Sequence, residues 1–128
     1  MKIGLYFGTF NPIHVGHLII ANHMLENSDL DEIWMVVTPL NPFKKKSSLL
    51  DNHHRLELVY KATEEYTKIK PSNIEFKLPQ PNYTAHTLAH ISDLYKNKQF
   101  CIGIRDIHWN CFNMLGLHAI FIERSLRK

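Results

Sequence analysis

The feature that most limits how this chain can fold is a buried strand that runs directly into a glycine-bearing turn and a helix. The apolar run Ile3–Phe7 is followed by Gly8, and residues 8–17 read GTFNPIHVGH. An uninterrupted apolar strand predicts a sheet that is covered on both faces, and a helix is expected to begin near Val15 or Gly16. Backbone N–H groups at a helix start favour negative charge, so the sequence predicts a phosphate site at this turn.

Two histidines mark the start of this expected helix. His14 and His17 are three positions apart, so they lie on the same side of the helix and can both donate hydrogen bonds to one ligand. A histidine pair at this spacing is by itself more often structural or merely exposed. Its place between a buried strand and a helix favours a nucleotide site, to which Gly8 allows close approach and in which Pro12 fixes φ.

Strands and helices alternate along the rest of the chain. The expected strands are Lys2–Phe7, Glu32–Thr38, Ile74–Leu78, Gln99–Ile104 and Ala119–Glu123. The expected helices are Val15–Asn27, a second from a cap at Asp51 or Asn52 to about Tyr66, and a third from Thr84 through Tyr95. This order predicts an α/β, Rossmann-like doubly wound parallel sheet of about five strands, with ligands beyond the carboxyl ends of the strands.

Composition narrows the class of protein. A length of 128 residues predicts one domain, spanning residues 1–128. The net charge of +3 suits a phosphate-bearing small molecule and gives no indication of nucleic-acid binding. Two cysteines are too few for a disulfide scaffold, and the apolar runs are too short to span a membrane. A cytoplasmic location is therefore expected, and the oligomeric state is left open.

Residues 8–17 also resemble the signature of the HxGH nucleotidylyltransferases, and most of all that of the nicotinate-nucleotide adenylyltransferase family. Members of that family transfer AMP from ATP to nicotinate mononucleotide, giving deamido-NAD and pyrophosphate in NAD biosynthesis. The resemblance implies that His14 and His17 are catalytic. It also implies an ATP-binding set that includes both histidines with Gly8, Thr9, Phe10 and Asn11.

Adenylyl transfer needs no nucleophile from the protein, because a phosphate oxygen of the acceptor attacks the α-phosphorus of ATP. The protein aligns two anions and neutralises the charge that develops on the phosphate oxygens. His14 and His17 are therefore expected to act as donors rather than as a general base, with Mg²⁺ accompanying ATP. Zinc is disfavoured because no third ligand stands nearby, and simple packing remains an alternative role for Phe10.

A second loop, residues 38–44 (TPLNPFK), is similar to the family loop that carries a phosphate-binding lysine. The resemblance implies that Lys44 contacts ATP and is catalytic. A solvated surface is the alternative, because a run of three lysines usually faces water. Arg55 also resembles a residue of a family helix, and an ion pair on the helix face is the alternative there.

Residues 81–88 (PNYTAHTL) resemble the Tyr-Thr-x-x-Thr-Leu segment with which the family holds the pyridine nucleotide. Tyr83, Thr84 and Thr87, together with Asn11, are therefore expected to bind the acceptor, through ring stacking and hydrogen bonds at a helix start. In the alternative, Thr84 is an ordinary N-cap and Tyr83 a partly buried ring. His86, where many relatives have Asp, could bind a metal with His90, although an exposed helix face is favoured.

Residues 101–128 depart from the family pattern. The family strand ends in Gly-x-Asp before a helix with a tryptophan, whereas residues 101–109 read CIGIRDIHW, which leaves Asp106 and Trp109 as acceptor-site candidates. The closing Ile-Ser-x-Thr-x-Ile-Arg helix has no counterpart, which predicts a C-terminally truncated domain. The alternatives are therefore another HxGH nucleotidylyltransferase, with a pantetheine-phosphate or cytidylyl acceptor, and an inactive nucleotide-binding remnant.

Overall fold

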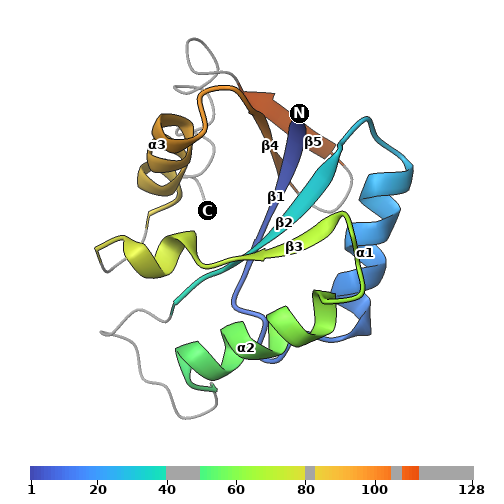
Figure 1. Ribbon diagram of the computed structural model, residues 1–128, viewed down its shortest axis with the longest axis vertical. Coiled ribbons are helices and arrows are strands. Elements are labelled where there is room, and N and C mark those ends of the chain that lie inside the picture. The colour runs from blue at the N-terminus through green and yellow to red at the C-terminus, as the bar shows by residue number, and fades with distance from the viewer. Residues whose placement is uncertain (40–49, 80–82, 105–107, 113–128) are drawn as a thin grey trace.

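A five-stranded sheet forms the centre of the computed structural model, which describes residues 1–39, 50–79, 83–104 and 108–112 (Figure 1). The strand order is β3-β2-β1-β4-β5, and the first four strands are parallel. Their bounds are Lys2–Gly8 for β1, Glu32–Val37 for β2, Ile69–Ser72 for β3, Gln99–Ile104 for β4 and His108–Phe112 for β5. The predicted Rossmann-like parallel sheet is thus confirmed, and its order reverses between β1 and β4, where ligands of such sheets bind.

Three helices flank the sheet on its two faces (Figure 1). They are α1 (Val15–Glu26), α2 (Asn52–Thr63) and α3 (Thr84–Leu94), and a short 3₁₀ helix, η1 (Ile74–Lys77), precedes α3. Helices α1 and α2 lie on one face and α3 on the other, as a doubly wound sheet requires. Within the described ranges, no helix combines the length and apolar character that crossing a membrane requires.

Alternate residues of β2 supply the two halves of the core. Ile33, Met35 and Val37 are fully buried in a cluster with residues of α1 and α2, whereas Val36 belongs to a second cluster with residues of α3. Successive side chains of a strand point to opposite faces, so this division follows from the pleat of the sheet. It explains why the strand is apolar nearly throughout.

The third strand differs from its prediction. The sequence predicts a strand at Ile74–Leu78, but β3 is Ile69–Ser72, and Ile74 opens η1 instead. Pro71 lacks a backbone donor and is tolerated because β3 lies at the edge of the sheet. The predicted strand is therefore wrong, because the observed strand ends before the predicted one begins.

Other element bounds shift less. The second helix ends at Thr63 rather than near Tyr66, and the N-cap of α3 is Tyr83 rather than Thr84. The predicted strand Ala119–Glu123 lies outside the described residues, and the observed fifth strand, β5, is antiparallel to β4. Cys101 of β4 is disulfide-bonded, which the sequence reasoning did not anticipate.

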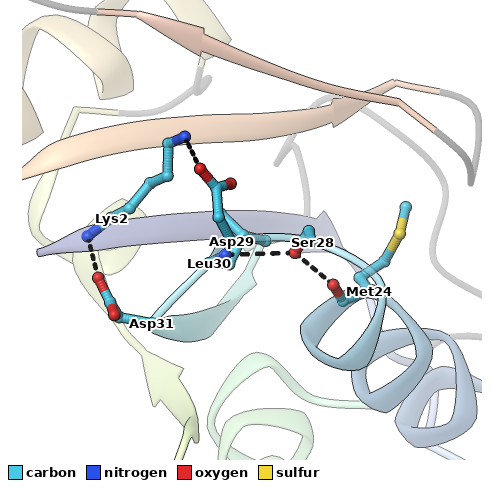
Figure 2. Close-up of polar contacts among 6 residues, drawn as sticks. All are labelled: Lys2, Met24, Ser28, Asp29, Leu30 and Asp31. Carbon is cyan, nitrogen blue, oxygen red and sulfur yellow. Dashed lines mark hydrogen bonds and ion pairs between the residues drawn. The ribbon is translucent and has the colours of Figure 1, made fainter.

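Polar contacts fix the turn between α1 and β2 against the first residue of β1 (Figure 2). The backbone N–H of Lys2 donates to Asp31 at 2.7 Å, and its ammonium group contacts Asp29 at 2.5 Å. Within the turn, the hydroxyl of Ser28 donates to the carbonyl of Met24. These contacts hold the amino end of β1, and the glycine turn begins at its opposite, carboxyl end.

Candidate nucleotide site at the carboxyl end of β1

The side chains of His14 and His17 cap the start of α1 by accepting hydrogen bonds from backbone amides of its N-cap residue and first turn. Nδ1 of His14, the N-cap residue, accepts a hydrogen bond from the N–H of Gly16 at 3.0 Å. Nδ1 of His17 accepts one from the N–H of His14 at 3.1 Å. The two imidazoles stack with their centroids 3.8 Å apart and their planes 28° apart. This is a capping box in which histidines take the places usually held by Ser or Thr and by Glu or Gln.

The capping bonds decide where each histidine carries its proton. A nitrogen that accepts a hydrogen bond from a backbone N–H cannot itself be protonated, so each neutral ring carries its hydrogen on Nε2. The stack therefore offers two Nε2–H donors from one pair of parallel rings. Two adjacent donors of this kind suit the oxygens of a di- or triphosphate.

The surroundings of His17 keep its ring neutral. Burial lowers the pKa of His17 below its ordinary value, and the nearby His14 lowers this pKa further. Both effects disfavour the charged form of the His17 ring. The lowered pKa of His17 favours its neutral form, and a role of the pair in hydrogen-bond donation to a ligand stays a prediction.

Glycine at position 16 is required by the cap itself. A Cβ atom there would lie 2.8 Å from Cε1 and 2.9 Å from Nδ1 of His14, closer than real contacts allow. The capping ring therefore occupies the space that any larger residue would need. This steric condition explains the glycine between the two histidines of the motif.

Phe10 packs in the core and turns the chain at the same time. Its ring is 2% exposed and meets the rings of Tyr6 and His17 edge to face, at centroid distances of 5.6 and 5.0 Å. Its backbone has a φ of 47°, a left-handed conformation that costs a bulky residue about 1–3 kcal/mol. The packing role is thus confirmed, and a role for its backbone in ATP binding stays a prediction.

The absence of a side chain at Gly8 leaves space for the Phe10 ring. A Cβ at position 8 would lie 3.0 Å from Cζ of Phe10, so the glycine gives room to the phenyl ring. Asn11, which follows Phe10, accepts a hydrogen bond from the N–H of Leu50 at 2.9 Å through its side-chain oxygen. The turn after β1 is therefore fastened on one side by packing and on the other by a side-chain amide.

The first backbone amides of α1, which the sequence predicts to be open to phosphate, already have acceptors within the protein. The N–H of Gly16 is held by the His14 ring and that of His17 by the His14 carbonyl, at 3.0 Å each. The idea that the first helical amides are open to phosphate is therefore wrong for these two residues, because the histidine cap satisfies them. Within the described part of the chain, no acceptor is seen for the backbone amides of Thr9 and Phe10, and their role as donors to a ligand stays a prediction.

Arg55 of α2 is fully buried and joins three separate segments. Its guanidinium donates to the carbonyls of Thr9, Thr38 and Leu50 and to the side-chain oxygen of Asn52. Burial lowers the pKa of Arg55, and Asp51 opposes this shift. The side chain thus points inward, and the alternative of an ion pair on the helix face is wrong.

The expected acceptor segment lies at the start of α3. Tyr83 is 55% exposed and meets the ring of His86 edge to face at 5.5 Å, so its phenol faces open space. Thr87, in contrast, is fully buried. Its hydroxyl donates to Oε2 of Glu75 at 2.6 Å and approaches the carbonyl of Tyr83 at 3.2 Å. The helix begins at Thr84, and contacts of these threonines with a substrate stay predictions.

Several predicted site residues are not placed by the structure. Lys44 and Asp106 lie outside the described residues, and Trp109 lies on β5, where only the backbone is described. No group of three or more His, Cys, Asp or Glu side chains within the described ranges could hold a metal ion.

Sequence reasoning missed Glu75. This carboxylate is 2% exposed and accepts hydrogen bonds from Thr38 and Thr87. Its signal in the sequence is an acidic residue between the apolar residues Ile74 and Phe76, which is unusual for a solvent-facing position.

The parallel strands and the helices on both faces of the sheet define a doubly wound α/β protein. The model of the cytidylyltransferase-like family matches residues 5–123, and the chain belongs to this family. Proteins named probable nicotinate-nucleotide adenylyltransferase are similar to it over 95% of the chain in Christiangramia forsetii, at 63% identity, and in Flavobacterium johnsoniae, at 72% identity. The chain spans 63% and 67% of the length of these two relatives.

A solved structure shows the same fold. The nicotinic acid mononucleotide adenylyltransferase of Plasmodium falciparum, in complex with NaAD, superposes with a TM-score of 0.64 at 22% identity. The match covers 80% of this chain and 51% of that protein. At this level of identity the likeness establishes the fold alone, and the chemistry has to be argued from the residues.

The tautomer of the histidine pair is directly measurable. We expect nitrogen-detected imidazole NMR to show both rings as Nε2–H tautomers at pH 7, and His17 to protonate at a pH below its ordinary pKa of 6.5. Because the folded pKa is lowered, the stabilisation from neutral His17 is present above pH 6.5 and is lost as the pH falls through the folded pKa. An Nδ1–H tautomer or a raised His17 pKa would contradict the capping geometry.

Substitution of Gly16 separates capping from helix stability. We expect Gly16→Ala to displace the His14 ring, losing a cap worth about 1 kcal/mol while gaining about 1 kcal/mol of helix propensity. The free energy of unfolding should therefore change little, whereas the imidazole signals of His14 should lose their Nε2–H signature. Unchanged His14 signals in the folded variant would show that the ring does not need this space.

Proposed function

We propose that this protein transfers AMP from ATP to nicotinate mononucleotide, giving deamido-NAD and pyrophosphate. The observation that carries the proposal is the stacked histidine pair, with both Nδ1 atoms occupied by backbone and both Nε2–H groups available. Such donors stabilise the negative charge that develops on the α- and β-phosphate oxygens as the bond to pyrophosphate breaks. The names of the relatives support the same activity.

The ATP side of the reaction is proposed at the turn after β1. His14 and His17 donate to the phosphates, the amides of Thr9 and Phe10 extend the cradle, and Lys44 adds a positive charge. The amide of Asn11 shapes the rim. Neutral donors bind a triphosphate without competing for its metal ion, so they complement rather than replace a divalent cation.

The acceptor is proposed to lie against the start of α3. The exposed ring of Tyr83 offers a face for a pyridine ring. Thr84, Thr87, Asp106 and Trp109 complete the proposed acceptor set. Many relatives have Asp at position 86, where this chain has a histidine. Any contact to the ribose at this position is therefore made by an imidazole instead of a carboxylate.

A divalent metal is general to nucleotidyl transfer, and we propose Mg²⁺ in this case. The ion is proposed to be bound chiefly by substrate phosphates, as Mg²⁺ commonly is. Bound in this way, the ion neutralises charge on the triphosphate. A cytoplasmic location stays a prediction from the sequence.

The proposal is tested by measuring pyrophosphate release with ATP and a panel of acceptors. We expect release with nicotinate mononucleotide, and a loss of about 10²–10³-fold in kcat for His17→Ala, as for other removed oxyanion donors. His23→Ala is the matched control, because His23 lies on the same helix, is exposed and has its ring Nδ1 against the side-chain amide of Asn27. Release with pantetheine phosphate or a cytidylyl acceptor alone would assign another transferase, and binding without release would indicate an inactive remnant.

A further inference from the structure

Two buried side chains, those of Arg55 and Glu75, form hydrogen bonds with the same residue, Thr38. Arg55, on α2, donates to the carbonyl of Thr38 at 3.0 Å, and Thr38 donates through its hydroxyl to Oε1 of Glu75, on η1, at 2.8 Å. Arg55 is 0% exposed and Glu75 is 2% exposed. Thr38 follows directly after β2 and also donates its N–H to the carbonyl of Gly8 at 2.9 Å. The residue is thus held by side chains or backbone of three other segments.

The contacts continue from Thr38 to both halves of the proposed site. Toward the phosphates, Arg55 also binds the carbonyl of Thr9, which precedes the left-handed residue of the turn. Toward the acceptor, Glu75 accepts from Thr87, whose own N–H donates to Tyr83 in the first turn of α3. Polar bonds therefore run without a gap from the phosphate turn to the acceptor helix.

Buried charges are costly unless they are hydrogen-bonded, and here every bond that the structure shows for them fixes the position of a loop or helix start. A hydrophobic pair would pack the same space without fixing direction. Ordered, directional contacts are what a transfer reaction needs, because the acceptor oxygen has to lie in line with the α-phosphorus. The hydrogen-bond network therefore connects the turn proposed to bind ATP with the helix start proposed to bind the acceptor.

We infer that Glu75 is a positioning residue, which holds the acceptor segment at α3 in register with the phosphate turn through Thr38 and Arg55. The inference rests on the proposed function, because it assigns the two ends of the network to the two substrates. Glu75 itself touches neither substrate. Its removal should therefore weaken acceptor binding more than ATP binding, instead of abolishing both.

Four variants test the inference. Glu75→Met and Thr38→Val remove hydrogen bonds with little change of volume. Glu75→Gln keeps both bonds, because its amide can donate to Thr87, whose hydroxyl then turns to the Tyr83 carbonyl at 3.2 Å. Thr38→Ser keeps the hydroxyl. The matched control is Thr63→Val, which removes another buried threonine hydroxyl, bonded to Val59 within α2.

We expect Glu75→Met and Thr38→Val to raise KM for nicotinate mononucleotide about tenfold, as for loss of a hydrogen bond to a charged group, with KM for ATP nearly unchanged. Glu75→Gln and Thr38→Ser should restore wild-type values, and Thr63→Val should alter neither KM. Equal effects on both substrates, or the same split in Thr63→Val, would overturn the inference, because loss of general stability would then explain the result.

Amide hydrogen exchange separates this inference from the proposed function. Exchange at Thr87, whose N–H donates to Tyr83 at 3.1 Å, should rise in Glu75→Met and Thr38→Val and stay unchanged in Thr63→Val. If the wild-type chain releases no pyrophosphate with any acceptor, the proposed function fails, and this exchange pattern still decides whether Glu75 fixes α3. Unchanged exchange in the first two variants would overturn the positioning role.

Discussion

The reciprocal hydrogen bonds of His14 and His17 with the backbone at the start of α1 set the geometry of the whole carboxyl end of β1. They use the Nδ1 atom of each ring, so each neutral ring carries its hydrogen on Nε2. They also exclude any side chain at position 16, because the His14 ring occupies that space. Helix capping uses the Nδ1 atom of each ring, and the proposed ligand recognition would use the Nε2 atom.

The turn that carries these rings is held by the core and by a buried charge. Phe10 adopts a left-handed backbone conformation while its ring packs against His17, and Arg55 binds the carbonyl of the preceding residue. A strained backbone persists where the surroundings determine it more than once. The sheet supplies those surroundings, because β1 is central and both its faces are covered.

Local patterns in the sequence were sufficient for the first strand and the start of α1, because strand burial and a glycine turn act within a few residues. The histidine cap was not predicted, since the first helical amides were expected to be open to phosphate. Distant partners were not predictable in this way. Two acceptors of Arg55 are main-chain carbonyls 17 and 46 positions away, and a main-chain carbonyl carries no signature of side-chain type. Ile74–Leu78 alternates apolar and polar residues, which is typical of a strand. The hydrogen bond that accompanies the burial of Glu75 comes from Thr87, in another element, and the local pattern does not show it.

The central claim is that both Nε2–H groups meet the phosphates of one bound nucleotide, and imidazole NMR during titration with a non-hydrolysable ATP analogue tests it most directly. We expect the Nε2–H signals of His14 and His17 to shift together and become protected from exchange, while the His23 signals on the same helix stay in place. Saturable binding of the analogue with both Nε2–H signals unmoved would contradict it.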